Sequence, residues 1–422
     1  MEKFSNRLNV LLVAYACRPG ESSEREVGWK WANLIQERHN VTVLTRETHR
    51  QHIEEYFAAN GRAESAPQFL FYDLPSWIRR WKKGERGLYL YYTLWSFVAT
   101  LKARRINRNH HHWDITHFLT FGTLLWPQFT FLMDTPYLLG PVGGGERIPL
   151  KLRKAFSLGG QAKIFIRRLV QLGLAVNPVY WANLLRAEHI LARTHETLEM
   201  IPWCFRQKTN LMLETALPRT ISLAKPSRTK QGPLQIVSVG RLISSKFNPL
   251  MLDVLFAFKQ AWCQPFRVTI IGDGPMRSQL KAQCDALGLS EVVFAGKKTG
   301  SEVFAALQAS DIYFSTTMKE GGTWAFFEAI INRLPIVALK VNGPDMIVGD
   351  DCGIKVRPES YAQSRDDLVA GLLALANDPE LREYYAVKAY EYVREHYNWE
   401  RILDEIDKLY KDLLAKHHLN NT

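Results

Sequence analysis

Short apolar runs alternate with longer amphipathic stretches along most of the chain. In the first half, residues 8–15 and 41–45 are apolar, and a helical pattern over residues 27–38 lies between them. A strand, a helix and a second strand at this spacing predict a βαβ unit with parallel strands. Residues 114–118 and 137–139 predict two further strands of the same sheet.

A second series of the same kind follows a break in the pattern. Residues 219–233 have no apolar period and hold Pro, Ser, Thr, Lys and Arg, which predicts a linker. Beyond it, short β-branched or aromatic runs separated by helical patterns predict a second doubly wound α/β domain. Its predicted strands are residues 234–239, 267–271, 292–295, 312–315 and 336–339.

These patterns predict an α/β protein with two Rossmann-like domains facing a central cleft. We expect an N-terminal domain over residues 1–218 and a C-terminal domain over residues 234–398, joined by the linker 219–233. The helical pattern near the end is too long for one crossover, so residues 399–422 are expected to form a tail that packs back on the N-terminal domain. Ligands of such sheets bind beyond the carboxyl ends of the strands.

Composition narrows the class of protein. The chain has 422 residues, of which 46% are hydrophobic, and this excludes a disordered or fibrous chain. Its five cysteines include no CxxC pair, which gives neither a disulfide framework nor a zinc site and fits a reducing compartment. No cleavable signal pattern and no membrane-spanning run are present, so we expect a cytoplasmic protein.

The net charge of +12 lies entirely in the first half. Residues 1–220 hold 30 Lys+Arg and 18 Asp+Glu, whereas residues 221–422 hold 24 of each. The excess gathers in residues 75–108, where Arg79, Arg80, Lys82 and Lys83 lie among Trp and Tyr, and in residues 147–187, which have eight basic residues and no acid. Such segments are typical of a solvated face, of a surface for anionic membranes or of a nucleic-acid groove. No nucleic-acid motif is present, so we expect a membrane partner.

The sharpest local signal follows the strand predicted at residues 312–315. Glu320 and Glu328 are eight residues apart, which on one helix places them on one face about 12 Å apart. Gly321 and Gly322 leave backbone N–H groups open at the helix start, where an anion is favoured. Two carboxylates around an anion site suit a nucleotide sugar, with hydroxyls on both sides of a diphosphate. A first-turn acid and a solvated helix face explain the same two residues.

Two more loops of the second domain carry candidate residues. Gly240 ends a strand and is followed by Arg241 and Lys246, which suit a phosphate group as a bidentate and a point-charge partner. Gly272 and Gly274 form a tight turn after another strand, which is typical of a structural turn and also of a ligand loop.

The first domain offers two candidates. Gly143, Gly144 and Gly145, followed by Glu146, form a permissive loop after a strand; it is no dinucleotide loop, because the glycines are contiguous. His117 is expected at the end of a strand, as a structural residue or as a cleft residue. The run His110–His112 lacks an acidic or Cys partner and predicts a polar loop.

Taken in order, these motifs resemble glycosyltransferase family 4, the retaining nucleotide-sugar transferases of the GT-B fold. The resemblance is carried by Gly240-Arg-Leu with Lys246, by the Gly272-Asp-Gly274 turn and by Glu320 with Glu328. In the first half, Gly28 in Glu-Val-Gly-Trp, His117 in Asp-Ile-Thr-His and the glycine run before Glu146 look like the branch that builds bacterial surface polysaccharides.

The resemblance implies roles for these residues. Arg241 and Lys246 would hold the donor diphosphate and Glu328 the ribose, while Glu320 and the backbone at Gly322 and Thr323 would lie over the donor sugar and phosphates. Gly240, Gly272, Gly274 and Gly321 would belong to the donor loops, and Gly28, Gly143, Gly144, Gly145 and Glu146 to acceptor-side loops. His117 would approach the sugar. Neither a metal nor another cofactor is expected. Three departures stand out: Arg333 replaces a usual Gly, Asn342-Gly-Pro-Asp345 replaces Gly-Gly-Pro-x-Glu, and Ser23-Glu-Arg-Glu-Val-Gly28 stands where Ser-Glu-Pro-Gly is common.

Three functions remain open. The first is a peripheral-membrane enzyme that adds a hexose-type sugar to a lipid-linked saccharide in cell-envelope polysaccharide biosynthesis, such as lipopolysaccharide or capsule. The second is a soluble GT-B enzyme with a small acceptor. The third is a non-catalytic scaffold that kept the fold. The first accounts best for the charge, because the anionic acceptor would bind the domain that holds it.

Overall fold

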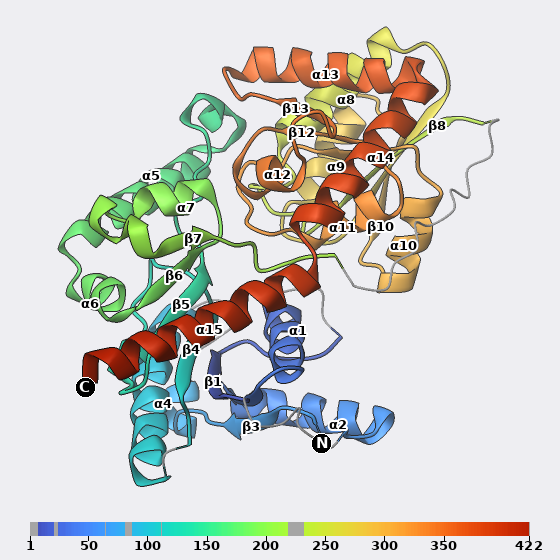
Figure 1. The fold of residues 1–422 in the computed structure, drawn as a ribbon. Coiled ribbons are helices and arrows are strands. Elements are labelled where there is room, and N and C mark those ends of the chain that lie inside the picture. Colours follow the sequence, from blue (N-terminus) through green and yellow to red (C-terminus); the bar gives the residue numbers. More distant parts are fainter. Residues whose placement is uncertain are drawn as a thin grey trace. The chain divides into compact units, whose positions relative to one another are not determined.

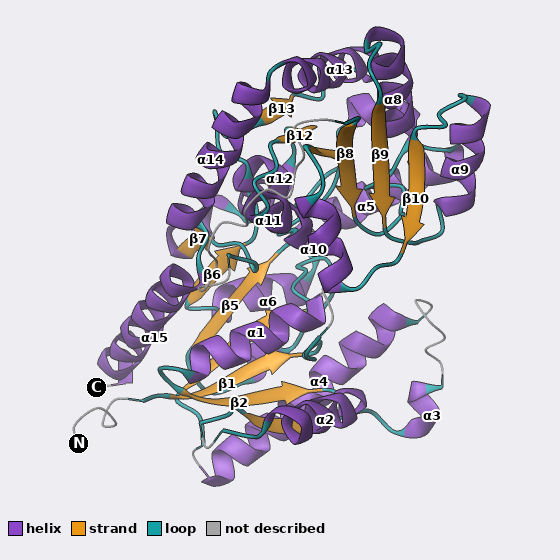
Figure 2. Ribbon diagram, turned by 90° about the vertical axis from the view of Figure 1, so that its right-hand side faces the viewer, coloured by secondary structure: helices purple, strands orange, loops and turns teal. Residues whose placement is uncertain are grey.

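The computed structural model describes residues 7–20, 24–63, 65–80, 87–110, 112–217 and 232–421. The chain forms two compact units. The first unit comprises Met1–Gly145, Val170–Glu214 and Trp399–Thr422, and the second comprises Glu146–Leu169 and Thr215–Asn398. Each unit is one parallel sheet with helices on its faces (Figures 1 and 2).

The first unit has a seven-stranded sheet in the order β3-β2-β1-β4-β5-β6-β7, and all its pairings are parallel. Its strands are β1 Asn9–Ala14, β2 Asn40–Thr45, β3 Gln68–Phe71, β4 Ile115–Thr120, β5 Tyr137–Val142, β6 His189–Ala192 and β7 Thr209–Leu211. Its helices are α1 Glu24–Gln36, α2 Arg50–Asn60, α3 Ser76–Arg79, α4 Leu88–His110, α6 Pro178–Arg186, α7 His195–Met200 and α15 Trp399–Asn421. Helix α5, Leu158–Gly173, begins in the second unit and ends in the first.

The second unit has a six-stranded parallel sheet in the order β10-β9-β8-β11-β12-β13. Its strands are β8 Leu234–Val239, β9 Phe266–Ile271, β10 Val292–Gly296, β11 Ile312–Ser315, β12 Ile336–Leu339 and β13 Ile354–Val356. Its helices are α8 Pro249–Ala261, α9 Arg277–Ala286, α10 Gly300–Gln308, α11 Trp324–Ile331, α12 Asn342–Ile347, α13 Tyr361–Asn377 and α14 Pro379–His396. The prediction of two parallel Rossmann-like α/β domains is confirmed.

Continuous apolar runs form the central strands because helices cover both faces of a parallel sheet. Every residue of β4, β5, β11 and β12 is buried. The first core gathers around Trp95, Phe118 and Tyr137, and the second around Phe258 and Phe314. Each core therefore fixes the strand ends from which candidate loops emerge.

The boundary between the units differs from the one predicted at residue 218. Residues 146–169 belong to the second unit, because Leu152 and Phe156 are buried in its core and Ile164 packs against it. A local pattern does not show this, since the same segment follows β5 directly along the chain. The predicted linker 219–233 lies outside the described residues except for its last two positions.

The last helix, α15, packs on the first unit. It lies along α1, and Arg38, just after the end of α1, contacts Asp404 at 2.6 Å and Glu400 at 3.5 Å. Trp399 and Tyr410 are buried against the ring of Trp31 and the imidazole of His117, respectively. None of the helices in the described part of the chain is both long and apolar enough to cross a membrane.

Candidate functional site

In the second unit, the loops after β8 and β9 are in close contact. The amide of Gly240 donates to the carbonyl of Ile271 at 2.9 Å, and the amide of Leu242 donates to the carbonyl of Asp273 at 3.0 Å. Gly272 has φ 138°, and a Cβ there would lie 1.9 Å from the carbonyl oxygen of Gly240. The glycines therefore join two loops, and this packing holds the segment from which Arg241 and Lys246 extend.

The central feature of this loop cluster is an ion pair. Lys246 Nζ lies 2.6 Å from the Glu320 carboxylate, and their side chains are 23% and 19% exposed. Arg241, five residues before Lys246, is exposed. The structure thus brings together two of the predicted residues that lie far apart in the sequence, and both remain within reach of solvent.

The predicted geometry of the two glutamates is wrong in one respect. Helix α11 begins at Trp324, so Glu320 lies in the loop before it, whereas Glu328 lies within the helix. The two carboxylates therefore do not share a helix face. Both carboxylates lie near enough to the buried Tyr313 to raise its pKa. Burial is the largest cause of that shift, and the charges of Glu328 and Glu320 add to it.

Tyr313 was not predicted as part of the site. It lies in β11 and is fully buried, and its hydroxyl donates to the carbonyl of Val239 at 3.3 Å, which ties β11 to the end of β8. Its only signal in the sequence is its place in a strand that precedes the two glutamates.

The loop before α11 is fixed from two sides. The amide of Met318 donates to the carbonyl of Ser245 at 2.7 Å. On the other side, the amide of Gly343 donates to the carbonyl of Glu320 at 3.1 Å, and a Cβ on Gly343 would lie 1.8 Å from the carbonyl oxygen of Gly321. The loop that carries Glu320, Gly321, Gly322 and Thr323 is therefore held by backbone contacts, and Thr323 is the N-cap residue of α11.

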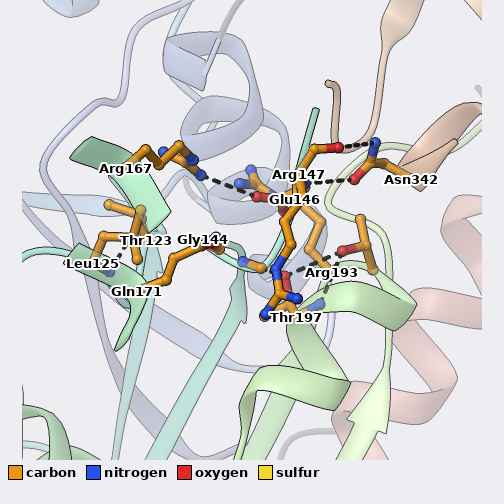
Figure 3. A network of polar contacts seen from close by, with 12 residues as sticks. Thr123, Leu125, Gly144, Glu146, Arg147, Arg167, Gln171, Arg193, Thr197 and Asn342 are labelled. Atoms are coloured by element: carbon orange, nitrogen blue, oxygen red, sulfur yellow. Dashed lines mark hydrogen bonds and ion pairs between the residues drawn. The ribbon is translucent and has the colours of Figure 1, made fainter. Parts of the chain in front are cut away.

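Asn342 braces the same loop and was noted in the sequence only as a departure from a family pattern. Its backbone has φ 43°, a conformation that Asn tolerates. Its side-chain amide donates to the carbonyl of Met318 at 3.3 Å. Its side-chain oxygen accepts from the amide of Arg147 at 3.2 Å (Figure 3). Another departure, Arg333, has φ 55° after α11, and its guanidinium lies 3.1 Å from Glu383.

In the first unit, His117 does not lie where the sequence predicted. It is the third residue of β4 and is fully buried. One ring nitrogen lies 2.6 Å from the Tyr410 hydroxyl and the other lies 2.6 Å from the carbonyl oxygen of Gly140. Burial lowers its pKa to about 4. In this structure His117 is a neutral residue that joins β4 to α15, and its ring has no exposed surface for a substrate.

The glycines of the first unit serve close packing. Gly28 lies in helix α1 and not in a loop, and a Cβ there would be 2.1 Å from the carbonyl oxygen of Ala16. A Cβ on Gly145 would be 2.1 Å from the carbonyl oxygen of Glu196. Gly144 accepts a hydrogen bond from the Gln171 side chain at 2.7 Å (Figure 3). Gly143 donates to the carbonyl of Gly122 at 2.7 Å.

Glu146, the first residue of the second unit, is 3% exposed, and its carboxylate lies 3.8 Å from the guanidinium of Arg167 in α5 (Figure 3). A buried acid beside an arginine anchors the start of the segment 146–169. The prediction that Glu146 belongs to an acceptor-side loop stays a prediction.

The basic segment 75–108 is partly neutralised. Arg104 and Arg108 both contact Asp134, at 2.5 Å and 2.7 Å, and these two arginines lower the Asp134 pKa to about 2, with the Arg104 hydrogen bond as the largest cause. Arg79 and Arg80 are exposed. Lys82 and Lys83 lie outside the described residues.

The described residues contain no cluster of three or more His, Cys, Asp or Glu side chains that would hold a metal ion. In the predicted polar loop, the rings of His110 and His112 lie 5.3 Å apart, and His111 is outside the described residues.

Comparison with known sequences points to the second unit. Residues 221–392 match the family model described as glycosyl transferases group 1. The chain is 24% identical to the uncharacterized glycosyltransferase MJ1069 of Methanocaldococcus jannaschii over 183 residues, which are 43% of this chain and 46% of that protein. It is 29% identical to the lipopolysaccharide core biosynthesis glycosyltransferase LpsD of Rhizobium meliloti over 189 residues, 43% of this chain and 50% of LpsD. The chain spans between 30% and 50% of the length of the curated relatives it matches.

Solved structures share the whole fold. Sucrose-phosphate synthase from Thermosynechococcus elongatus has a TM-score of 0.66 at 14% identity, covering 97% of this chain and all of that one. HepE from Anabaena, solved with UDP and glucose, has a TM-score of 0.58 at 14% identity, covering 96% of this chain and all of its own. The fold is therefore GT-B, and its second unit carries a group 1 glycosyltransferase sequence pattern.

Proposed function

We propose that this chain is a retaining, metal-independent glycosyltransferase that moves a hexose-type sugar from a nucleotide-sugar donor to a lipid-linked saccharide. The Lys246–Glu320 pair carries the proposal, because it lies at the ends of β8 and β11 in the unit that matches group 1 glycosyltransferases. A cell-envelope polysaccharide is the proposed product, in keeping with the similarity to the lipopolysaccharide core biosynthesis glycosyltransferase LpsD.

In the proposed reaction, Arg241 and Lys246 hold the donor diphosphate, and Glu328 accepts hydrogen bonds from the ribose hydroxyls. The bond between the sugar carbon and the diphosphate oxygen breaks while the acceptor hydroxyl bonds to the same face of the sugar. The acceptor proton leaves with the diphosphate. Negative charge grows on the diphosphate as it departs, so fixed cations stabilise the transition state more than the bound donor.

Glu320 has a second proposed task. With no donor bound, its carboxylate pairs with the Lys246 ammonium and keeps that group in place. The pair also lowers the free-energy cost of a positive charge in a partly desolvated site. On donor binding, the diphosphate takes over as the partner of Lys246, and the Glu320 carboxylate is then available to the sugar hydroxyls. The braces at Met318 and Gly343 hold the loop during this exchange.

The proposal of a lipid-linked acceptor and a membrane partner is supported by exposed aromatic and basic residues. Trp77 is 60% exposed, Tyr89 43% and Leu90 57%. The exposed Arg79 and Arg80 follow Trp77 closely in the sequence. Aromatic and apolar side chains with neighbouring cations suit an anionic membrane surface. We therefore place the acceptor on a lipid and not on a free sugar.

A thermal-shift screen with UDP-, GDP- and ADP-sugars tests the donor site. A ligand at 100 times its dissociation constant stabilises the folded protein by about 2.7 kcal/mol, which is readily measured. We expect a shift with one nucleotide class, its loss in Glu328→Ala and its retention in Glu391→Ala, a matched change at an exposed glutamate of α14. No shift with any of the three classes, or an unchanged shift in Glu328→Ala, would contradict the proposal.

A further inference from the structure

A second polar site lies in the second unit, near β12 and β13, at the edge of the sheet opposite to β10. A groove of about 510 Å³ opens between the short 3₁₀ helix Leu150–Ala155, helix α5 and the segments that follow β12 and β13. Its volume is in the range of ligand sites. Six charged residues line it: Lys151, Arg168, Lys340, Arg357, Asp345 and Glu359.

The charges in this groove do not balance. Glu359 is matched by Lys151 at 2.5 Å. Asp345 is matched by Lys355 at 2.7 Å and by Lys340 at 3.7 Å. Both carboxylates thus have a lysine partner, whereas neither Arg168 nor Arg357 lies within ion-pair distance of a carboxylate that the structure describes. Arg357 is near enough to Glu359 to add to the lowering of its pKa, of which Lys151 is the main cause.

Arg168 and Arg357 have no ion pair or side-chain hydrogen bond with any residue that the structure describes. Arg357 is exposed, whereas Arg168 is half-buried and its Nε is shielded from solvent with no acceptor among the described residues. A shielded guanidinium N–H without an acceptor is costly, and an anion entering the groove would satisfy it. Two guanidiniums also suit a phosphate, whose oxygens accept paired hydrogen bonds.

Helix α5 adds an apolar surface beside the groove. Leu158 is 85% exposed, Phe165 62%, Ile166 58% and Leu169 51%, and these residues form one stripe. Arg168 lies three residues after Phe165 and beside Leu169, so it borders the stripe. Residues 147–187, which include all of α5, contain eight basic residues and no acid. An exposed apolar stripe on a helix without acids is typical of a helix that lies in a membrane interface.

We propose that the groove binds a phosphate-bearing head group of an anionic lipid, with Arg168 and Arg357 on the phosphate oxygens and the stripe of α5 against the lipid chains. The groove and the donor site share no residue: the groove is lined from the segments that follow β12 and β13 and from residues 149–168, whereas Lys246 and Glu320 follow β8 and β11. The claim that a lipid supplies the phosphate rests on the proposed function, in which the acceptor is membrane-bound. The claim that the groove binds an anion rests on the groove residues alone.

The test uses the full-length protein, vesicles of phosphatidylglycerol in phosphatidylcholine, and soluble glycerol 3-phosphate. The variants are Arg357→Glu, the milder Arg168→Gln and the control Lys281→Glu. Lys281 is an exposed residue of α9, which connects β9 to β10 at the opposite edge of the sheet. The donor-induced thermal shift is measured on each variant, because its retention shows an intact fold and separates a failure of this site from a failure of the donor site.

We expect the wild type to sediment with the anionic vesicles and not with pure phosphatidylcholine. Binding should weaken about fivefold in Arg168→Gln and more in Arg357→Glu, and by less than twofold in Lys281→Glu. If the wild type binds glycerol 3-phosphate but not vesicles, and both groove variants lose that binding, the groove is an anion site for a soluble phosphate, and the lipid part of the proposal is wrong. Equal vesicle binding by the groove variants and the control, together with no effect on glycerol 3-phosphate, would overturn the proposal.

Discussion

The two sheets have the same parallel architecture, yet the charged or titratable residues at their strands have opposite surroundings. In the second unit, Lys246 and Glu320 lie in loops beyond β8 and β11 and keep part of their surface exposed. In the first unit, His117 lies inside β4 and is enclosed by Tyr410 and Gly140. A position inside a central strand is thus enclosed, whereas positions in the loops beyond the strand ends stay partly exposed.

The physical cause is the covering of a parallel sheet. A side chain within a central strand faces a helix layer and loses its water, so only its neutral form is tolerated, as the lowered His117 pKa shows. A side chain beyond the strand end is not covered in this way. Its charge then needs only one partner, which Lys246 and Glu320 provide for each other.

The largest effect is expected in the second unit, on removal of the partly exposed cation Lys246. In Lys246→Met the diphosphate loses a fixed cation, and removal of one such group in other enzymes costs 10²–10³ in rate, or about 3–4 kcal/mol. We expect the proposed transfer to slow by between about 10² and 10³, measured as release of nucleoside diphosphate, with little change in the folded protein's stability. Lys281→Met is the control, and equal rates in the two variants would remove Lys246 from the site.

A slightly smaller effect is expected where the loops of this unit touch. In Gly272→Ala the new methyl group would lie 1.9 Å from the Gly240 carbonyl oxygen at a φ of 138°. Overpacking and backbone strain together should lower the free energy of unfolding by about 3 kcal/mol, measured by urea denaturation. Gly300→Ala, where the methyl group meets nothing within 4 Å, should be neutral or stabilising. A stable Gly272→Ala protein would show that the two loops separate easily.

The smallest effect is expected in the first unit, on the pH dependence of stability that the buried His117 causes. The His117 pKa is about 4 in the folded protein and about 6.5 in an unfolded chain. Its contribution is therefore complete above about pH 6.5 and declines as the pH falls toward 4, because the unfolded chain takes up the proton first. Between about pH 7.5 and pH 5, His117 should account for about 2 kcal/mol of lost unfolding free energy.

The measurement is urea denaturation at both pH values for the wild type and His117→Gln. The variant is less stable overall, so only the difference between the two pH values is compared, and this difference should shrink. His110→Gln, a change at an exposed histidine, should leave it unchanged. A pH dependence that His117→Gln retains in full would mean that the ring is solvated, and the contrast between the two units would fail.

Much of the fold could be predicted from the sequence. The strands expected at residues 234–239, 312–315 and 336–339 agree with β8, β11 and β12 at both ends. Strands β3, β6, β7 and β13 were missed. Unlike the equally short β11 and β12, none of them is buried at every residue, so none gives a continuous apolar run. Helix α11 was placed too early, since glycines and an acid in front of a helix resemble its first turn.

The sequence by itself determined the succession of strands and helices and the residues that follow each strand, because both depend on neighbours within a few positions. Only the tertiary structure decided which of these residues meet solvent and which meet one another. Lys246 is paired by Glu320, His117 is enclosed by Tyr410 from the last helix, and residues 146–169 enter the core of the second unit. Burial and ion pairing act through space between distant parts of the chain, and a local pattern carries no record of them.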